Sequence, residues 1–161
     1  MTTGKLKVET RGEREIVFTR PFDAPRKLVW EAHTKAEYVR RWLLGPSGWT
    51  MPVCEIDLKV GGRYRYVWRN TDGREMGMGG VFREVAKPER LVTTELFDDD
   101  WTGGETINTT AFAEQTGKTM LTTVVLYSSR EAREAALKTP MADGMETGYA
   151  RLDALLGEIR D

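Results

Sequence analysis

Residues 141–159 read MADGMETGYARLDALLGEI. In this C-terminal stretch, apolar side chains recur at three- and four-residue steps, the spacing that gives a helix one apolar face. Thr139-Pro140 precedes it and can start a helix, and the pattern then continues for about five turns. A lone helix must bury such a face, so the sequence predicts a large partner surface elsewhere in the chain. The face consists of Met141, Met145, Tyr149, Leu152, Leu155, Leu156 and Ile159.

The middle of the chain supplies that partner as strands. Residues 63–69 read RYRYVWR, so Tyr64, Tyr66 and Trp68 share one face and the arginines occupy the other. Turn-forming links such as Asn70-Thr71-Asp72-Gly73 separate successive strands. Because no helix intervenes between them, the last six strands are predicted to form an antiparallel meander. The predicted strands are 13–20, 52–59, 63–69, 76–85, 91–97, 105–114 and 118–127.

Short helices are expected at two places outside the meander. Pro25 suits the first turn of a helix, which predicts two short helices over about 26–33 and 35–42, directly after the first strand. Another short helix is expected between Ser128 and Pro140. The sequence therefore predicts an α+β fold in which a curved antiparallel sheet wraps around one long C-terminal helix. Residues 1–12 are polar and are predicted to be flexible, and residues 13–161 are predicted to form a single domain.

Several motifs connect this arrangement with a known family. They are Phe22-Asp23-Ala24-Pro25, Gly61-Gly62-Arg63-Tyr64, Pro88-Glu89-Arg90-Leu91-Val92 and Gly144-Met145 with Gly148-Tyr149. Through them the chain resembles, from about residue 14 to 158, the activator of Hsp90 ATPase homologue 1-like (AHSA1-like) family of the START/Bet v 1-like (SRPBCC) superfamily. The resemblance implies the helix-grip fold. It implies no single function, because the superfamily includes ligand carriers, cyclases and co-chaperone domains.

Composition excludes several classes of protein. The chain has 161 residues with 24 basic and 25 acidic side chains, a net charge of −1, which argues against nucleic-acid binding. No stretch is long and apolar enough to predict a membrane span, and the first residues lack the apolar core of a secretory signal. The single cysteine, Cys54, excludes an intrachain disulfide. We therefore expect a cytoplasmic protein.

The aromatic face of residues 64–68 has two interpretations. It is either ordinary core packing or one wall of a cavity for a small, largely apolar or aromatic ligand. Gly144 and Gly148 of the last helix likewise either allow close packing or keep space open for a ligand. The predicted cavity residues are Tyr64, Tyr66, Trp68, Met78, Phe82, Met145 and Tyr149, with Trp42 and Trp49 at an entrance.

The sequence predicts no catalytic residue, no metal site and no cofactor. His33 is the only histidine, and nothing near it in sequence completes a catalytic triad, so it is interpreted as structural. The carboxylates of residues 98–100 are interpreted as a solvated loop. An enzyme would need an acid or base inside the pocket, which an inward Glu95, Glu114, Arg65 or His33 would provide.

Three functions follow from these interpretations. The leading hypothesis is a non-enzymatic carrier or sensor of a small apolar or aromatic molecule. The alternatives are a cyclase, dehydratase or hydrolase acting on an aromatic substrate, and a co-chaperone-like partner of Hsp90. The last is disfavoured, because the chain lacks the preceding partner-binding domain of two-domain activators. Homodimerisation is compatible with this kind of module, and the sequence does not decide it.

Overall fold

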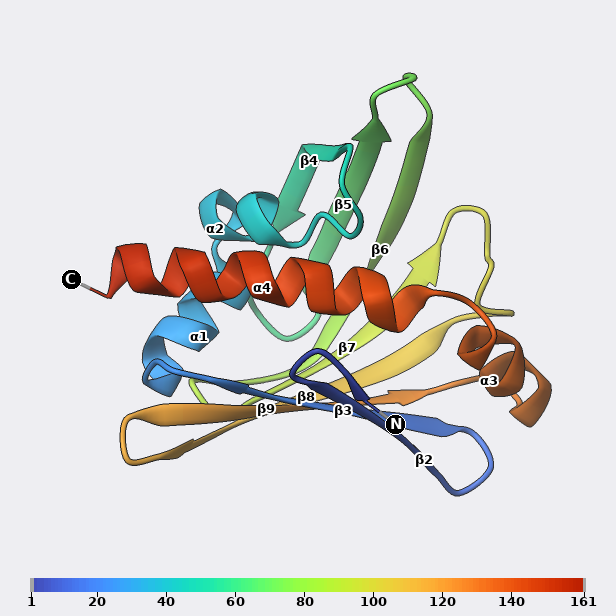
Figure 1. The fold of residues 1–161 in the computed structure, drawn as a ribbon. Coiled ribbons are helices and arrows are strands. Elements are labelled where there is room, and N and C mark those ends of the chain that lie inside the picture. The colour runs from blue at the N-terminus through green and yellow to red at the C-terminus, as the bar shows by residue number, and fades with distance from the viewer. Residues whose placement is uncertain (1, 161) are drawn as a thin grey trace.

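The computed structural model describes residues 2–160 and shows thirteen helices and strands in that part of the chain (Figure 1). One antiparallel sheet joins all the described strands in the order β1-β2-β3-β9-β8-β7-β6-β5-β4. The elements are β1 (Thr2–Thr3), β2 (Leu6–Arg11), β3 (Glu15–Phe22), α1 (Arg26–Thr34), α2 (Ala36–Trp42), β4 (Trp49–Ile56), β5 (Arg63–Asn70), β6 (Glu75–Ala86), β7 (Arg90–Phe97), β8 (Thr106–Gln115), β9 (Lys118–Leu126), α3 (Arg130–Leu137) and α4 (Met141–Ile159).

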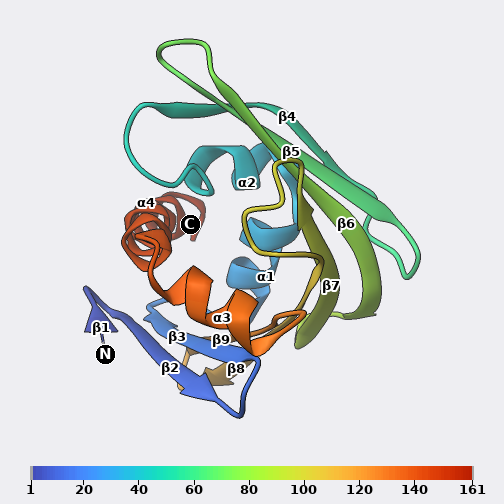
Figure 2. The ribbon, with the colours of Figure 1, turned by 90° about the vertical axis from the view of Figure 1, so that its right-hand side faces the viewer.

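The sheet curves around the helices, as Figure 2 shows with α4 nearly end-on. Strands β4 to β7 rise along one side, β2, β3, β8 and β9 form the base, and α1, α2 and α4 occupy the concave side. This arrangement confirms the predicted α+β class and helix-grip fold. The six-strand meander β4–β9, the two short helices after the first long strand and the long C-terminal helix are confirmed as well.

The prediction of a flexible N-terminus is wrong for the described residues. Residues 6–11 form β2, which pairs with β3 in an antiparallel register from Lys7 opposite Thr19 to Arg11 opposite Glu15. Leu6 and Val8 are buried, while the residues between and after them are exposed. Two apolar side chains at alternate positions suffice to give a strand one dry face, and their charged neighbours hid this pattern in the sequence.

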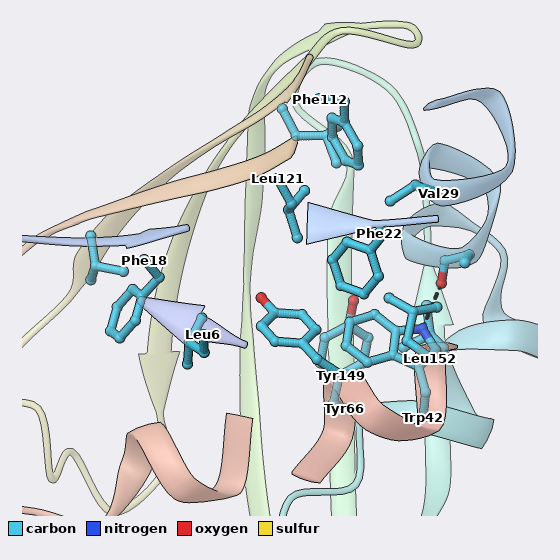
Figure 3. Close-up of a cluster of buried hydrophobic side chains, with 14 of the residues drawn as sticks. Leu6, Phe18, Phe22, Val29, Trp42, Tyr66, Phe112, Leu121, Tyr149 and Leu152 are labelled. Carbon is cyan, nitrogen blue, oxygen red and sulfur yellow. Dashed lines mark hydrogen bonds between the residues drawn. The ribbon is translucent and has the colours of Figure 1, made fainter. Parts of the chain in front are cut away.

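Close packing joins α4 to the two short helices. The Trp42 indole at the end of α2 donates a hydrogen bond from Nε1 to the Ala32 carbonyl oxygen, 2.8 Å away (Figure 3). A Cβ on Gly148 would lie 3.0 Å from the Trp42 carbonyl oxygen, so glycine lets α4 approach α2 closely. The packing interpretation of Gly148 is therefore confirmed, and the space that its missing side chain leaves is used by the helix backbone.

A buried ion-pair network fixes α4 to β3. Arg20 is 1% exposed, and its guanidinium contacts two carboxylates of α4. It donates to Glu146 over 2.8 and 3.0 Å and to Asp153 over 3.0 and 2.9 Å. The same guanidinium lies over the rings of Phe22 and Tyr149. Hydrogen bonds from Arg20 hold the pKa of Glu146 below its ordinary value, so this carboxylate is ionised at neutral pH.

Arg20→Ala is expected to lower the free energy of unfolding by ~3 kcal/mol, because it removes the cation that joins Glu146 and Asp153 and, among residues 2–160, leaves Asp153 with only Lys5, 3.8 Å away. Arg41→Ala is the matched control. Arg41 forms an ion pair of 2.6 Å with Glu158, but both side chains are about half exposed. Its loss is expected to cost less than ~1 kcal/mol. Urea unfolding of both variants measures the difference, and equal losses would show that the buried network does not hold α4.

Candidate functional site

The inner face of strands β4 to β7 presents a row of apolar side chains. Cys54, Tyr66, Met78 and Phe97 lie directly opposite one another across the four strands. The Tyr66 ring contacts the rings of Tyr64 and Trp68, with centroids 5.2 and 5.9 Å away. The aromatic face predicted for residues 64–68 therefore points toward the helices.

Tyr64 of β5 is fixed to β7, two strands away in the sheet. Its hydroxyl donates a hydrogen bond of 2.6 Å to the Thr94 carbonyl oxygen on β7. Gly80 on the intervening strand makes this approach possible, because a Cβ there would overlap the same carbonyl oxygen. The Tyr64 ring thus has a set position, with its centroid 5.5 Å from that of Phe82.

The helix side of the interior centres on Tyr149 of α4. Its ring stacks on Trp42 at 5.6 Å and meets Phe22 edge-on at 5.5 Å (Figure 3). Its phenol lies beside Thr123 on β9, and burial raises the pKa of Tyr149 to about 12. Tyr149 is therefore the α4 side chain that connects the helix with the floor of the sheet.

The two halves of the interior differ slightly in how much surface their side chains keep accessible. On the side of β2, β3 and β9, Leu6, Ile16, Phe18, Leu121 and the α4 residue Leu152 are 0–2% exposed. The predicted cavity residues on β5, β6 and α4 keep more accessible surface. Their exposed fractions are Tyr64 6%, Tyr66 8%, Trp68 8%, Met78 5%, Phe82 5% and Tyr149 7%. All of these side chains are buried, and the second group keeps slightly more accessible surface than the first.

Polar side chains form the floor of that second half. The register places Thr93 opposite Phe82 on one side and Asn108 on the other, and Asn108 opposite Val125. Because side chains directly opposite one another share a face, this row belongs to the concave side. The half-buried polar residues of the concave floor, called the polar floor below, are Thr93, Glu95, Asn108, Thr110 and Thr123.

Glu95 is the ionisable member of the polar floor. Its strand neighbours Thr93 and Phe97, two residues away on either side, fix it to the concave face, and it lies opposite Thr106 of β8. Among residues 2–160 no hydrogen bond or ion pair reaches its carboxylate, and burial raises the pKa of Glu95 to about 7. The Glu95 side chain is half-buried, and its unpaired oxygens keep accessible surface. An unpaired carboxyl group with a raised pKa is a candidate binding or catalytic group.

His33 occupies the helix end of the interior. Its ring lies between Trp42 and Phe112, with centroids 4.9 and 5.3 Å away, and its Nδ1 is 2.8 Å from the Val29 carbonyl oxygen. Burial lowers the pKa of His33 to about 4, so the ring is neutral at pH 7 and Nδ1 carries the donated proton. These contacts agree with the structural interpretation of His33.

Of the two residues predicted at an entrance, Trp42 lies in the interior and Trp49 lies half-buried at the start of β4. Trp42 is 3% exposed between α1, α2 and α4, so it belongs to the interior. Trp49 starts β4, opposite Asn70 at the tip of the β5–β6 hairpin, and the Arg74 guanidinium lies over its ring. Met145 is half-buried on α4. The prediction for Trp42 was wrong because its position in a helix does not reveal the hydrogen bond between its indole and the Ala32 carbonyl oxygen.

An aromatic cluster that sequence reasoning missed lies where β7 ends. Trp68 stacks on Phe97 at 6.5 Å, and Phe97 contacts Trp101, which is 36% exposed. The Trp68 indole also donates a hydrogen bond of 2.7 Å to the Leu43 carbonyl oxygen. The cluster therefore runs from solvent to the inner row. Because Trp101 follows three aspartates, the sequence predicts a loop there. The one signal for the cluster is the alternating strand pattern that ends at Phe97.

Two of the candidate acid–base residues lie outside. Arg65 is on the outer face of β5, where it forms a two-pronged ion pair with Asp98 over 2.7 and 2.6 Å. Glu114 is exposed and accepts a hydrogen bond from the Arg26 backbone N–H. Only Glu95 and His33 of the four face the interior.

Two hollows are open to the outside of the protein, and neither lies between α4 and the sheet. One, of about 430 Å³, lies against α3 and is lined by Arg130, Glu131, Glu134, Ala135 and Lys138. The other, of about 180 Å³, lies on the outer face of β5 and β6 beside Arg65 and Asp98. Within the described part of the chain, no group of three or more His, Cys, Asp or Glu residues is arranged to hold a metal ion.

The fold and the concave floor define a helix-grip protein of the START/Bet v 1-like class. The model of the family described as activator of Hsp90 ATPase homolog 1-like protein matches residues 23–157, and the chain belongs to this family. No protein of curated function matches the chain. Over residues 2–160, no helix is both long and apolar enough to cross a membrane.

Several bacterial proteins of solved structure are similar. A Rhodobacter sphaeroides protein is 33% identical, with a TM-score of 0.91 over 97% of this chain and 100% of that one. Ms6760 from Mycobacterium smegmatis is 24% identical, with a TM-score of 0.80 over 93% of this chain and 95% of that one. An AHSA1-like protein from Aeromonas hydrophila is 20% identical, with a TM-score of 0.66 over 86% and 93%. The last two similarities concern the fold alone.

The raised pKa of Glu95 predicts that the protein loses stability as pH rises. The folded state holds the Glu95 proton up to about pH 7, whereas an unfolded glutamate loses it near its ordinary value of 4.5. The extra stability is present below pH 4.5 and is lost as pH rises through 7. Glu95→Gln is expected to match the wild type at pH 4.5 and to exceed it by ~2 kcal/mol at pH 8.5. Urea unfolding at both values measures this, and a pH-independent difference would contradict it.

Proposed function

We propose that the protein binds a small, largely apolar or aromatic molecule on the concave face of the sheet beneath α4. One observation carries the proposal: the five side chains of the polar floor stay half-buried on the concave face of the central strands β7, β8 and β9, although Leu91, Phe112, Leu121 and Val125 on the same face are buried. The aromatic row on β5 offers stacking surfaces beside this floor. The helix-grip fold generally accommodates hydrophobic ligands, which supports the proposal.

The burial of the interior limits the size of the ligand. The predicted cavity residues keep only a few per cent of their surface accessible, so we propose a small ligand, and side chains must move to admit it. The way in that we favour passes the cluster of Trp68, Phe97 and Trp101, because it reaches from solvent to the inner row. The lining then consists of Tyr64, Tyr66, Trp68, Met78, Phe82 and Tyr149, with Met145 beside them.

One observation favours an enzyme as the second candidate. Glu95 is an unpaired acid among half-buried polar groups, which is the kind of residue a cyclase, dehydratase or hydrolase needs. In that case the bound molecule would be consumed, and Glu95→Gln would stop its consumption without stopping its binding. The cytoplasmic location, the homodimer and the absence of Hsp90 activation remain predictions from the sequence.

Filling the floor is expected to abolish binding. Asn108→Phe adds a ring on the concave face of β8, and Thr109→Phe adds the same ring one residue further, on the outer face. With indole as the probe, Asn108→Phe is expected to weaken binding by at least ~10-fold, and Thr109→Phe is expected to bind like the wild type. Shifts of backbone amide NMR signals give the dissociation constants and show where the probe binds.

The same pair of variants distinguishes a hollow from a solid core. In a hollow the new ring occupies existing space, so both variants are expected to stay within ~1 kcal/mol of the wild type by urea unfolding. A much larger loss for Asn108→Phe than for Thr109→Phe, together with no indole-dependent shifts at β5, β7 and β8 in the wild type, would refute the proposed function.

A further inference from the structure

Glu95 is a charged group without a partner of opposite charge. The interior contains two other buried charges, and both are neutralised: Arg20 contacts Glu146 and Asp153, and Arg133 contacts the Gly12 and Glu15 carbonyl oxygens and Glu134. Neither arginine interacts with Glu95, whose ionisation is opposed by burial alone. The ionised carboxylate therefore lacks the cation that buried charges normally require.

The groups that face Glu95 are neutral at pH 7. The Tyr64 and Tyr66 phenols approach it from β5 and the Tyr127 phenol from the end of β9, and burial holds the pKa of each above its ordinary range. Cys54 of β4 lies beyond Tyr66, and burial raises its pKa, although Arg40 of α2 interacts with the thiol and opposes the rise. Arg40 does not act on Glu95. From α4, Met141 contacts Tyr127 and Tyr149 faces Thr123. Glu105 lies beyond Tyr64 and is exposed.

Glu95 thus combines a single negative charge with nearby aromatic rings. Such rings attract a cation through their faces, and a carboxylate in the same site adds a direct ion pair. The Tyr64 hydroxyl and the Asn108 amide already donate hydrogen bonds to the Thr94 carbonyl oxygen and the Thr106 hydroxyl. The carboxylate is the group in this site that distinguishes a cation from a neutral molecule of the same shape.

We infer that the interior site binds an organic cation, an apolar or aromatic body carrying a substituted ammonium group that pairs with the Glu95 carboxylate. This inference rests on the proposed function and names the ligand class for the same site. The ligand supplies the positive charge that this part of the structure lacks, and its apolar body lies against Tyr66 and Trp68.

Binding of such a cation must depend on pH in one direction. Only the ionised form of Glu95 forms the ion pair, so affinity for a permanently charged ligand rises as the carboxyl group loses its proton. With half-ionisation near pH 7, the dissociation constant is expected to fall ~30-fold between pH 5.5 and pH 8.5. A neutral ligand that accepts a hydrogen bond from the protonated carboxyl group would show the opposite trend.

The experiment uses two probes of one shape, benzyltrimethylammonium and its carbon analogue neopentylbenzene. Neither probe titrates, so any pH dependence belongs to the protein. Dissociation constants are measured by NMR on the full chain at pH 5.5, 7.0 and 8.5. The wild type is compared with Glu95→Gln and with Glu114→Gln, which removes an exposed carboxylate at the far end of β8. Urea unfolding confirms that each variant is folded.

In the wild type and in Glu114→Gln, the affinity for benzyltrimethylammonium is expected to rise ~30-fold from pH 5.5 to pH 8.5. In Glu95→Gln this affinity is expected not to change with pH. The affinity for neopentylbenzene is expected not to rise with pH in any of the three proteins. If both probes bind with the same pH dependence, or if Glu95→Gln keeps the gain, the cation site is refuted while the proposed apolar binding stands. If neither probe binds at millimolar concentration, both are refuted.

Discussion

The attachment of α4 determines how much space the fold encloses. Its apolar face packs mainly against α1, α2 and the β1–β2 edge, and Arg20 on β3 holds it through Glu146 and Asp153. The two attachments lie at opposite edges of the sheet, because α2 packs against β4 while β1 and β2 form the other edge. Gly148 lets the helix approach α2 closely. The helix therefore closes the open side of the curved sheet (Figure 2), and the central strands β7 and β8 have no comparable contact with it.

The polar side chains of the polar floor are explained by this position of α4. Threonine, asparagine and glutamate on the concave face of central strands would each cost free energy in a filled core, because they would be desolvated without full compensation. Asn108 donates to Thr106, which donates weakly to the Glu95 carbonyl oxygen, so part of the cost is offset within the sheet. The remaining polar groups keep contact with water. The half of the interior beside β2, β3 and β9 needs no such arrangement, and its side chains are almost all aliphatic or aromatic.

Most of the fold could be predicted from the sequence, because the local pattern of apolar and polar residues identifies most of its helices and strands. The period-two pattern of residues 63–69 and the three- and four-residue steps of residues 141–159 each specify one element without tertiary information. The failures have a common cause. Strand β2 depends on Leu6 and Val8 alone, and its identity comes from pairing with β3. Trp42 was placed at an entrance because the sequence does not reveal the bond from its indole to Ala32. The identity of β2 and the position of Trp42 both depend on contacts with other elements, which the local sequence pattern does not reveal.

The site was harder to predict than the fold for a further physical reason. An apolar residue at a strand position identifies the inner face, whereas a polar residue there normally identifies the outer one. On β7 the inner face carries Leu91, Thr93, Glu95 and Phe97, a mixture that reads as ambiguous in isolation. The sequence alone did not show whether the Glu95 side chain points inward, which would favour an enzyme over a carrier. Register with Phe82 and Met78 settles that direction, because neighbouring strands force Thr93 and Phe97 inward and the carboxylate between them must follow. The charge in the interior is therefore a consequence of sheet register, and it is the feature that separates this protein from a simple apolar container.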